Sequence, residues 1–221
     1  MMIEALLYIF FTGEILSNAP VFDNASVLQN YSLSNSVIQK KEKKSPFFVQ
    51  DDSVALAAVD LKTQKILLEK NLYRSQPIAS LTKLMTTLII LESHALDEVV
   101  TVDKIATQVA GAQIDLYANE QLTVGTLVEA MLIPSANDAA VALAIYNAGS
   151  EENFVKKMNQ KAQAWGLSSA QFYNASGLDI LFVDDSEILA NRMSVYDVLQ
   201  MTRKALRYDF VKTAVQKTVF E

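Results

Sequence analysis

The segment Pro77-Ile78-Ala79-Ser80-Leu81-Thr82-Lys83 decides how this chain of 221 residues is interpreted. Residues Ser80 to Ser93 are apolar on nearly every side of a helical projection, which is typical of a buried helix. If this helix begins at Ser80, then Ser80 and Lys83 stand three residues apart and share one face of its first turn. The positive end of the helix dipole would also stabilise negative charge on the serine oxygen.

These two side chains have a chemical interpretation and a structural one. A serine hydroxyl is a weak nucleophile until a base removes its proton, and a lysine in an apolar, desolvated place can be that base. The alternative is that Ser80 caps the helix and that Lys83 lies on the surface. Lys83 is, however, the only charged residue between Arg74 and Glu92, and burying a lysine without a reason is costly. This observation weakens the structural alternative without removing it.

A second candidate segment is Ile133-Pro134-Ser135-Ala136-Asn137-Asp138, which falls between two predicted helices. Alternate residues such as Ser135 and Asn137 can face the same way, where a hydroxyl could relay a proton and an amide could hold a carbonyl group. Taken alone, Ser-x-Asn is weak evidence, because both residue types cap helices. Asn137 as the cap of the next helix is therefore the competing interpretation.

Strand and helix signals place these segments in an α+β fold. Val54 to Val59 and Ile66 to Leu68 predict two strands joined by a tight polar turn, which are too few for a stable sheet. Downstream the apolar spacing becomes helical, and several helices start at capping residues. Besides the helix at Ser80, helices are expected after Thr123 until Pro134, over Asp138 to Ala148, after Ser150 until Gly166, and after Ser194, which resembles a capping box with Asp197.

Composition and charge exclude several classes of function. The chain has no cysteine, which rules out thiol catalysis, disulfides and cysteine-ligated zinc. Its single histidine, His94, cannot form a multi-histidine metal site, and we interpret it as a surface residue at a helix end. Trp165 is expected in the core. The net charge of -6, without a dense basic stripe, argues against a nucleic-acid partner.

Residues 1–50 are interpreted as a degraded or mis-started export signal with a polar linker, and residues 51–221 as the folded domain. Ala5 to Phe11 is apolar, and Ser17-Asn18-Ala19 resembles a cleavage site. No Lys or Arg precedes Lys40, however, and the apolar run is too short to cross a bilayer. An ordinary buried segment is the alternative interpretation of this run.

Taken together, Ser-x-x-Lys at Ser80 and Ser-x-Asn at Ser135 resemble the signature of the penicillin-recognising serine acyltransferases. Longer stretches narrow the resemblance to the low-molecular-mass penicillin-binding proteins that are D-alanyl-D-alanine carboxypeptidases. These stretches are PIASLTKLMT (Pro77–Thr86), LTVGTLVEAMLIPSANDAAVALA (Leu122–Ala144) and FYNASGLD (Phe172–Asp179). The resemblance runs from about Val54 to the end of the chain.

The resemblance implies a fold and a site. The fold would be of the penicillin-binding, β-lactamase-like transpeptidase type, an α+β fold with an antiparallel sheet flanked by helices plus a helical lobe. Ser80 would attack the carbonyl between the two terminal D-alanines of a peptidoglycan stem peptide, and Lys83 would take its proton. Ser135 would pass a proton to the departing D-alanine, and Asn137 would hold the substrate. Asn174 in the third stretch would support the site.

The resemblance also implies partners and a location. The substrate would be a peptidoglycan stem peptide ending in D-Ala-D-Ala, and β-lactam antibiotics would block Ser80 covalently. No metal or other cofactor would be needed. The protein would be exported to the bacterial cell envelope, either periplasmic or on the outer face of the cytoplasmic membrane, and association with that membrane stays open.

One motif of the resembled family is not found in the chain. Its Lys-Thr-Gly motif is absent, since Lys217-Thr218-Val219 lacks the glycine. We therefore expect a truncated chain without the C-terminal strands of the fold, and the alternative is a family member that has lost this motif. In either case we expect poor substrate binding and little turnover. Two other functions stay open. One is a class A-like β-lactamase, although its usual Ser-Asp-Asn is Ser-Ala-Asn here, and the other is a non-catalytic peptidoglycan-binding relative.

Overall fold

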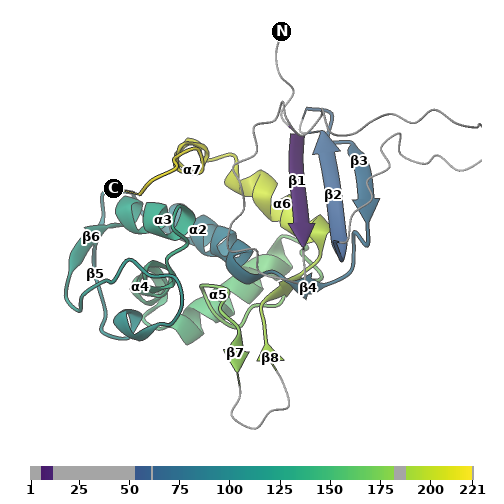
Figure 1. The fold of residues 1–221 in the computed structure, drawn as a ribbon. Coiled ribbons are helices and arrows are strands. Elements are labelled where there is room, and N and C mark those ends of the chain that lie inside the picture. Colours follow the sequence, from purple (N-terminus) through teal and green to yellow (C-terminus); the bar gives the residue numbers. More distant parts are fainter. Residues whose placement is uncertain (1–5, 12–52, 61, 182–187, 221) are drawn as a thin grey trace, which may run out of the picture. The chain divides into compact units, whose positions relative to one another are not determined.

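The computed structural model of the protein describes residues 6–11, 53–60, 62–181 and 188–220. Residues 1–70 form one compact unit and residues 71–221 form another. Strands come first along the chain, helices dominate after Ser80, and the strands pair in an antiparallel way (Figure 1). This arrangement is that of an α+β protein and confirms the predicted fold class.

The first unit contains a three-stranded antiparallel sheet. Its order is β1 (Leu6–Phe11), β2 (Ala55–Asp60) and β3 (Ile66–Lys70), with β2 in the middle. The small and β-branched side chains of β2 are buried, as the sequence predicted for the segment Val54 to Val59. The polar turn after β2 is stabilised by Asp60, whose carboxylate accepts hydrogen bonds from the backbone and hydroxyl of Thr63 and from the Lys62 N–H.

Strand β1 was not predicted. Its six residues pair with β2 from Leu6 opposite Asp60 to Phe11 opposite Ala55. An apolar run with aromatic and β-branched residues fits a strand as well as it fits the apolar part of an export signal, so composition alone could not separate the two. The export signal stays a prediction, and the predicted linker lies outside the described residues.

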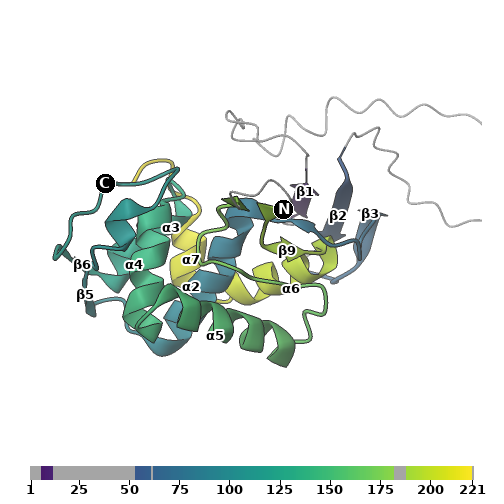
Figure 2. The same cartoon turned by 90° about the horizontal axis from the view of Figure 1, so that it is seen from below.

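Helices dominate the second unit. They are α2 (Thr82–Ser93), α3 (Val124–Leu132), α4 (Asn137–Ala148), α5 (Glu151–Ala164), α6 (Val195–Ala205) and α7 (Asp209–Ala214). Helix α2 lies at the centre, where α3, α4, α5 and α6 pack against it (Figures 1 and 2). Most of its residues are buried, in agreement with the apolar pattern of Ser80 to Ser93. The second unit is thus a helical body built around the helix that carries Lys83.

Side-chain caps fix the starts of three helices where the sequence predicted them. The hydroxyls of Thr123, Ser150 and Ser194 each accept a hydrogen bond from a backbone N–H three residues further on. The predicted capping box at Ser194 is only half formed, because the Asp197 carboxylate accepts from the backbone and hydroxyl of Ser169 instead. The Ser169 hydroxyl in turn accepts from the Ser194 N–H, at 2.7 Å. A second serine therefore completes this cap.

Short strand pairs connect the helices, and none of them was predicted, because two or three residues show no periodicity. They are β4 (Gln76–Pro77) with β9 (Arg192–Met193), β5 (Val99–Thr101) with β6 (Gln121–Thr123), and β7 (Ile180–Leu181) with β8 (Ile188–Leu189). The β4–β9 pair places the chain just before Ser80 beside residues 191–193. Within the described ranges, no helix combines the length and the apolar character needed to span a bilayer.

Candidate active site

Ser80 lies in a 3₁₀ turn, Ala79–Leu81, immediately before α2. The sequence predicted that the helix begins at Ser80, and the structure instead inserts this tighter turn at its N-terminus. Ser80 and Lys83 nevertheless share one face, since Lys83 Nζ lies 3.0 Å from Ser80 Oγ. The alternative interpretation of both residues is wrong: the Ser80 hydroxyl caps neither helix, and Lys83 is only 2% exposed.

The Lys83 ammonium has three oxygen neighbours from three parts of the chain. Besides Ser80 Oγ, Nζ lies 2.8 Å from Asn137 Oδ1 at the start of α4 and 2.8 Å from the carbonyl oxygen of Ser176. No carboxylate is among these hydrogen-bond partners, so the charge of Lys83 is buried without an ion pair to any residue that the structure describes. Burial lowers the pKa of Lys83 from 10.5 to about 8.

Asn137 is oriented by the loop that precedes β6. Its Nδ2 donates to the carbonyl oxygen of Ala110 at 2.8 Å, and its backbone N–H donates to that of Ala112 at 2.7 Å. Since Nδ2 faces a carbonyl, Oδ1 must face Lys83. Ala136 is the residue at the N-cap position of α4, and no side chain caps that helix, so the interpretation of Asn137 as a plain cap is wrong.

Ser135 completes the cluster from the turn between α3 and α4. Its hydroxyl donates to Ser80 Oγ at 3.0 Å. Its φ angle of 64° lies in the left-handed region, which costs a non-glycine residue roughly 1 kcal/mol or more. Pro134 before it ends α3, as predicted. The four predicted side chains of Ser80, Lys83, Ser135 and Asn137 are thus brought together in one hydrogen-bonded group.

Loop 172–178 supplies the third oxygen neighbour of Lys83 and is braced by Asn174. Asn174 Oδ1 accepts from the Gly177 N–H, and Nδ2 donates to the Leu178 carbonyl, each at 2.6 Å. Thr86 Oγ1 on α2 donates to the Ala175 carbonyl at 2.7 Å. The hydrogen bonds of the Asn174 side chain to described residues lie within the loop or with Asn191. This arrangement fits the supporting role that the resemblance implied.

Gly177 lets this loop approach the Ser80 turn closely. Its φ angle is 88°, and a Cβ atom at this position would lie 1.9 Å from the carbonyl oxygen of Ala79. No side chain can be accommodated there without moving one backbone segment away from the other. The glycine of the Phe-x-Asn-x-x-Gly-Leu stretch is therefore required by backbone contact beside Ser80.

Sequence reasoning missed three contributors to the site: the Ser176 carbonyl, Asp138 and Asn191. The buried Asp138 carboxylate accepts from the backbone N–H groups of Ile114 and Leu116 and so holds the loop that orients Asn137. Asp138 directly follows the Ser-x-Asn segment and could have been noticed. A carbonyl group carries no sequence signal, and Asn191 lies in a stretch without a pattern.

His94 lies outside this group. It follows the last residue of α2, 11 residues beyond Lys83, which is about 16 Å along a helix axis. Its Nδ1 lies 2.7 Å from Glu98 Oε2, and its ring contacts Tyr146. The helix-end position agrees with the prediction, although the residue is half-buried rather than on the open surface.

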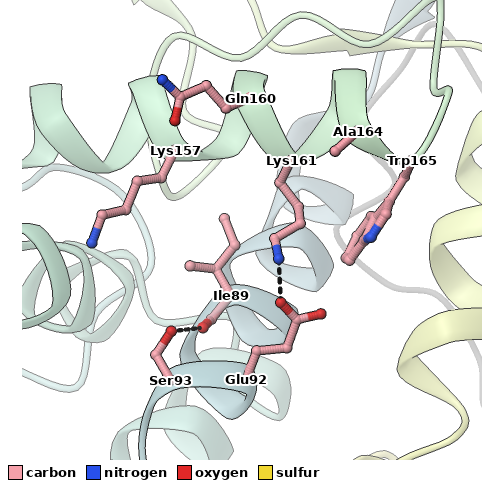
Figure 3. Close-up of a pocket in the computed structure, with 8 residues that line it drawn as sticks. All are labelled: Ile89, Glu92, Ser93, Lys157, Gln160, Lys161, Ala164 and Trp165. Atoms are coloured by element: carbon pink, nitrogen blue, oxygen red, sulfur yellow. Dashed lines mark hydrogen bonds and ion pairs between the residues drawn. The ribbon is translucent and has the colours of Figure 1, made fainter.

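A separate hollow lies between the last turns of α2 and helix α5 (Figure 3). Trp165 stands at its end and is half-buried, so the expectation of a core residue is wrong. Its ring lies 4.5 Å from Lys204 Nζ. The two lysines of the hollow are already engaged, Lys161 with Glu92 and Lys157 with Asn147. Among the residues that the structure describes, no acidic or histidine side chains gather as they would around a metal ion.

Comparisons with known proteins agree with this geometry. The family model described as D-alanyl-D-alanine carboxypeptidase matches residues 39–219. The D-alanyl-D-alanine carboxypeptidase DacF of Bacillus subtilis is 33% identical over 181 residues, which are 80% of this chain and 44% of that protein. The chain therefore spans less than half the length of this curated relative.

Solved structures show the same fold. The D-alanyl-D-alanine carboxypeptidase DacD from Francisella tularensis superposes with a TM-score of 0.68 at 27% identity, over 90% of this chain and 46% of that one. Penicillin-binding protein D2 from Listeria monocytogenes, solved in its ampicillin-bound form, gives a TM-score of 0.62 at 28% identity, over 74% of this chain and 66% of that one. The transpeptidase-type fold expected from the resemblance is confirmed, and the chain belongs to the D-alanyl-D-alanine carboxypeptidase family.

Proposed function

We propose that the protein is a serine-type D-alanyl-D-alanine carboxypeptidase, which removes the terminal D-alanine from peptidoglycan stem peptides through an acyl-enzyme on Ser80. One observation carries the proposal. Lys83 is almost fully buried, forms no ion pair within the described part of the chain, and its amine lies 3.0 Å from the Ser80 hydroxyl. A lysine in this environment is suited to act as a base.

Of the three oxygen neighbours of Lys83 described above, only one can donate a proton to it. A neutral amine has two hydrogens and one lone pair. Asn137 Oδ1 and the Ser176 carbonyl oxygen can only accept hydrogen bonds, so they take the two hydrogens. The lone pair then faces Ser80. The Ser80 hydroxyl, alone among these three neighbours, carries a hydrogen that can rotate toward Lys83 Nζ and be donated to it. Loss of a proton from Lys83 thus reverses this hydrogen bond and prepares Ser80 for attack.

The lowered pKa makes this neutral form accessible. With a pKa of about 8, roughly a tenth of Lys83 is neutral at pH 7. An unperturbed lysine with a pKa of 10.5 would be neutral in only about one molecule in 3,000. Burial therefore raises the population of the neutral base by about 300-fold, and it lowers the stability of the folded state at any pH where Lys83 is charged.

The proposed reaction follows from these contacts. Ser80 Oγ forms a bond to the carbonyl carbon between the two D-alanines while its proton passes to Lys83 Nζ. Ser80 Oγ, now bonded to carbon, has no hydrogen to relay, so the Lys83 proton returns through the Ser135 hydroxyl beside it to the nitrogen of the departing D-alanine, and the C–N bond breaks. Asn137 holds Lys83 in place from one side, and contact of Asn137 with the substrate is part of the proposal, as the resemblance implies. Water then hydrolyses the ester on Ser80.

The same first step explains the other expectations from the family. A β-lactam presents a carbonyl group to Ser80, and its ring opens to leave an ester that is released slowly. The ampicillin-bound relative supports β-lactams as ligands of this fold. The match to D-alanyl-D-alanine carboxypeptidases supports the proposal that the protein works in the bacterial cell envelope, outside the cytoplasm.

The experiment is to incubate the full chain with a short peptide ending in D-Ala-D-Ala and to measure free D-alanine. The wild type should release it slowly, because the chain lacks the Lys-Thr-Gly motif, whereas Ser80→Ala should release none and a peptide ending in L-Ala-L-Ala should not be cleaved. Fast turnover of a chromogenic cephalosporin would favour the β-lactamase alternative. Binding of the peptide without D-alanine release or a covalent intermediate would contradict the proposal and favour a non-catalytic peptidoglycan-binding relative.

A further inference from the structure

The position of the Ser176 carbonyl matters because it is one of the two fixed acceptors of Lys83. It belongs to loop 172–178, which contains no helix or strand residues. The loop therefore depends on side-chain hydrogen bonds for its place beside α2. Asn174 braces the loop internally, and the Thr86 hydroxyl attaches one carbonyl of it to α2.

Asn191 connects this loop with the beginning of α2. Its Nδ2 donates to the Asn174 carbonyl at 2.9 Å and to Thr82 Oγ1 at 3.0 Å. Its Oδ1 accepts from the Tyr173 N–H at 2.6 Å and from the Asn174 N–H at 3.3 Å. The side chain is 1% exposed, so water cannot replace these bonds. Both hydrogens and both lone pairs of the amide are thus in use.

The backbone of Asn191 also forms a hydrogen bond with the segment that precedes Ser80. Its carbonyl accepts from the Ile78 N–H at 2.9 Å, next to the β4–β9 pair. Ile78 precedes the Ser80 turn, and Thr82 follows it. One residue therefore fixes both ends of the segment that contains Ser80, and its amide also holds the loop that contacts Lys83.

We propose that Asn191 is a positioning residue for the acylation centre: its amide fixes loop 172–178 against the Ser80 segment and so holds the Ser176 carbonyl on Lys83 Nζ. The role in acylation rests on the proposed function. The structural effect on Lys83 does not, because it can be measured without a substrate.

The inference predicts what Asn191→Ala does to Lys83. Thr82 Oγ1 and the Asn174 carbonyl lose their donor, the loop loosens, and water gains access to the amine. Hydration favours the charged form, so the pH of half-titration of Lys83 should rise by about one unit. The neutral form at pH 7 should then fall about tenfold.

Asn159→Ala is the matched control. Like Asn191, Asn159 forms hydrogen bonds through its side-chain amide with the backbone of loop 172–178. Its Oδ1 accepts from the Phe172 N–H at 3.0 Å, and its Nδ2 donates to the Phe172 carbonyl at 2.9 Å. Its Nδ2 also donates to the Val155 carbonyl on α5 at 3.1 Å. This variant should lose stability as Asn191→Ala does, but should leave the titration of Lys83 unchanged.

The titration is followed by NMR of ¹³Cε-labelled lysines in the full chain, with the Lys83 signal assigned by its loss in Lys83→Arg. Thr82→Val serves where Asn191→Ala does not fold, because it removes one acceptor of the Asn191 amide and should give a smaller upward shift. The proposal is overturned if neither foldable variant shifts Lys83, or if Asn159→Ala shifts it equally. Absence of acylation in the wild type would refute the proposed function and leave this result standing.

Discussion

The burial of Lys83 should make the stability of the protein depend on pH in a defined window. The perturbation is Lys83→Met, which keeps an unbranched side chain and removes the titrating amine. The folded state lowers the pKa of Lys83 from 10.5 to about 8, so folding disfavours its charged form. The unfolded chain therefore binds more protons than the folded one between these two pH values.

Below pH 8 the lysine is charged in both states, and its charge costs the folded state about 3 kcal/mol. As the pH rises from about 8 to about 10.5, this cost disappears, and the wild type gains stability relative to Lys83→Met. Loss of the donor to Asn137 and Ser176 shifts the stability of the variant by a constant, because those groups do not titrate.

The assay is denaturant unfolding of both proteins at several pH values from 7 to 10.5. The difference between their free energies of unfolding should change by about 3 kcal/mol in favour of the wild type across this window. Other titrating groups are common to both proteins and cancel in the difference. A difference that stays flat from pH 7 to 10.5 would mean that Lys83 titrates normally in the folded state, and the argument for a lysine base would fail.

Three further predictions concern the acylation of Ser80 by a penicillin. Its rate should rise about tenfold per pH unit below pH 8 and level off above it, as followed by stopped-flow with a fluorescent penicillin; a flat profile would speak against Lys83 as the base. Gly177→Ala should destabilise the protein by several kcal/mol in thermal unfolding and slow acylation, because its Cβ would meet the Ala79 carbonyl; an unchanged melting temperature would refute the backbone-contact argument. Ser135→Ala should slow acylation by roughly 100-fold with little effect on stability, and near wild-type kinetics would remove Ser135 from the proton path.

Local signals predicted the helical body well. Thr123, Ser150 and Ser194 cap helices where expected, since a cap involves neighbours within three or four residues. Lys83 was identified because a single charge in an apolar helix stands out in the sequence. Its burial and its contact with Ser80 then follow from one helical turn.

Other features depend on contacts that the sequence does not encode locally. Asn191 donates a hydrogen bond to Thr82, which is 109 residues away in the sequence, and its partners in loop 172–178 are mostly backbone groups. Trp165 was expected in the core, yet it is half-buried, and the ammonium groups of Lys161 and Lys204 lie over its ring. Strand β1 was missed because pairing with β2, rather than its own composition, makes it a strand.

The most direct test of the central claim is to locate the covalent adduct after the full chain is treated with a penicillin. Intact mass followed by peptide mapping should find one adduct, on Ser80, and none in Ser80→Ala. Lys83→Arg should stay folded by circular dichroism and remain unmodified, because arginine keeps the charge but cannot give up its proton. An adduct on another residue, an adduct that survives Ser80→Ala, or normal acylation of Lys83→Arg would contradict a Ser80 nucleophile activated by Lys83.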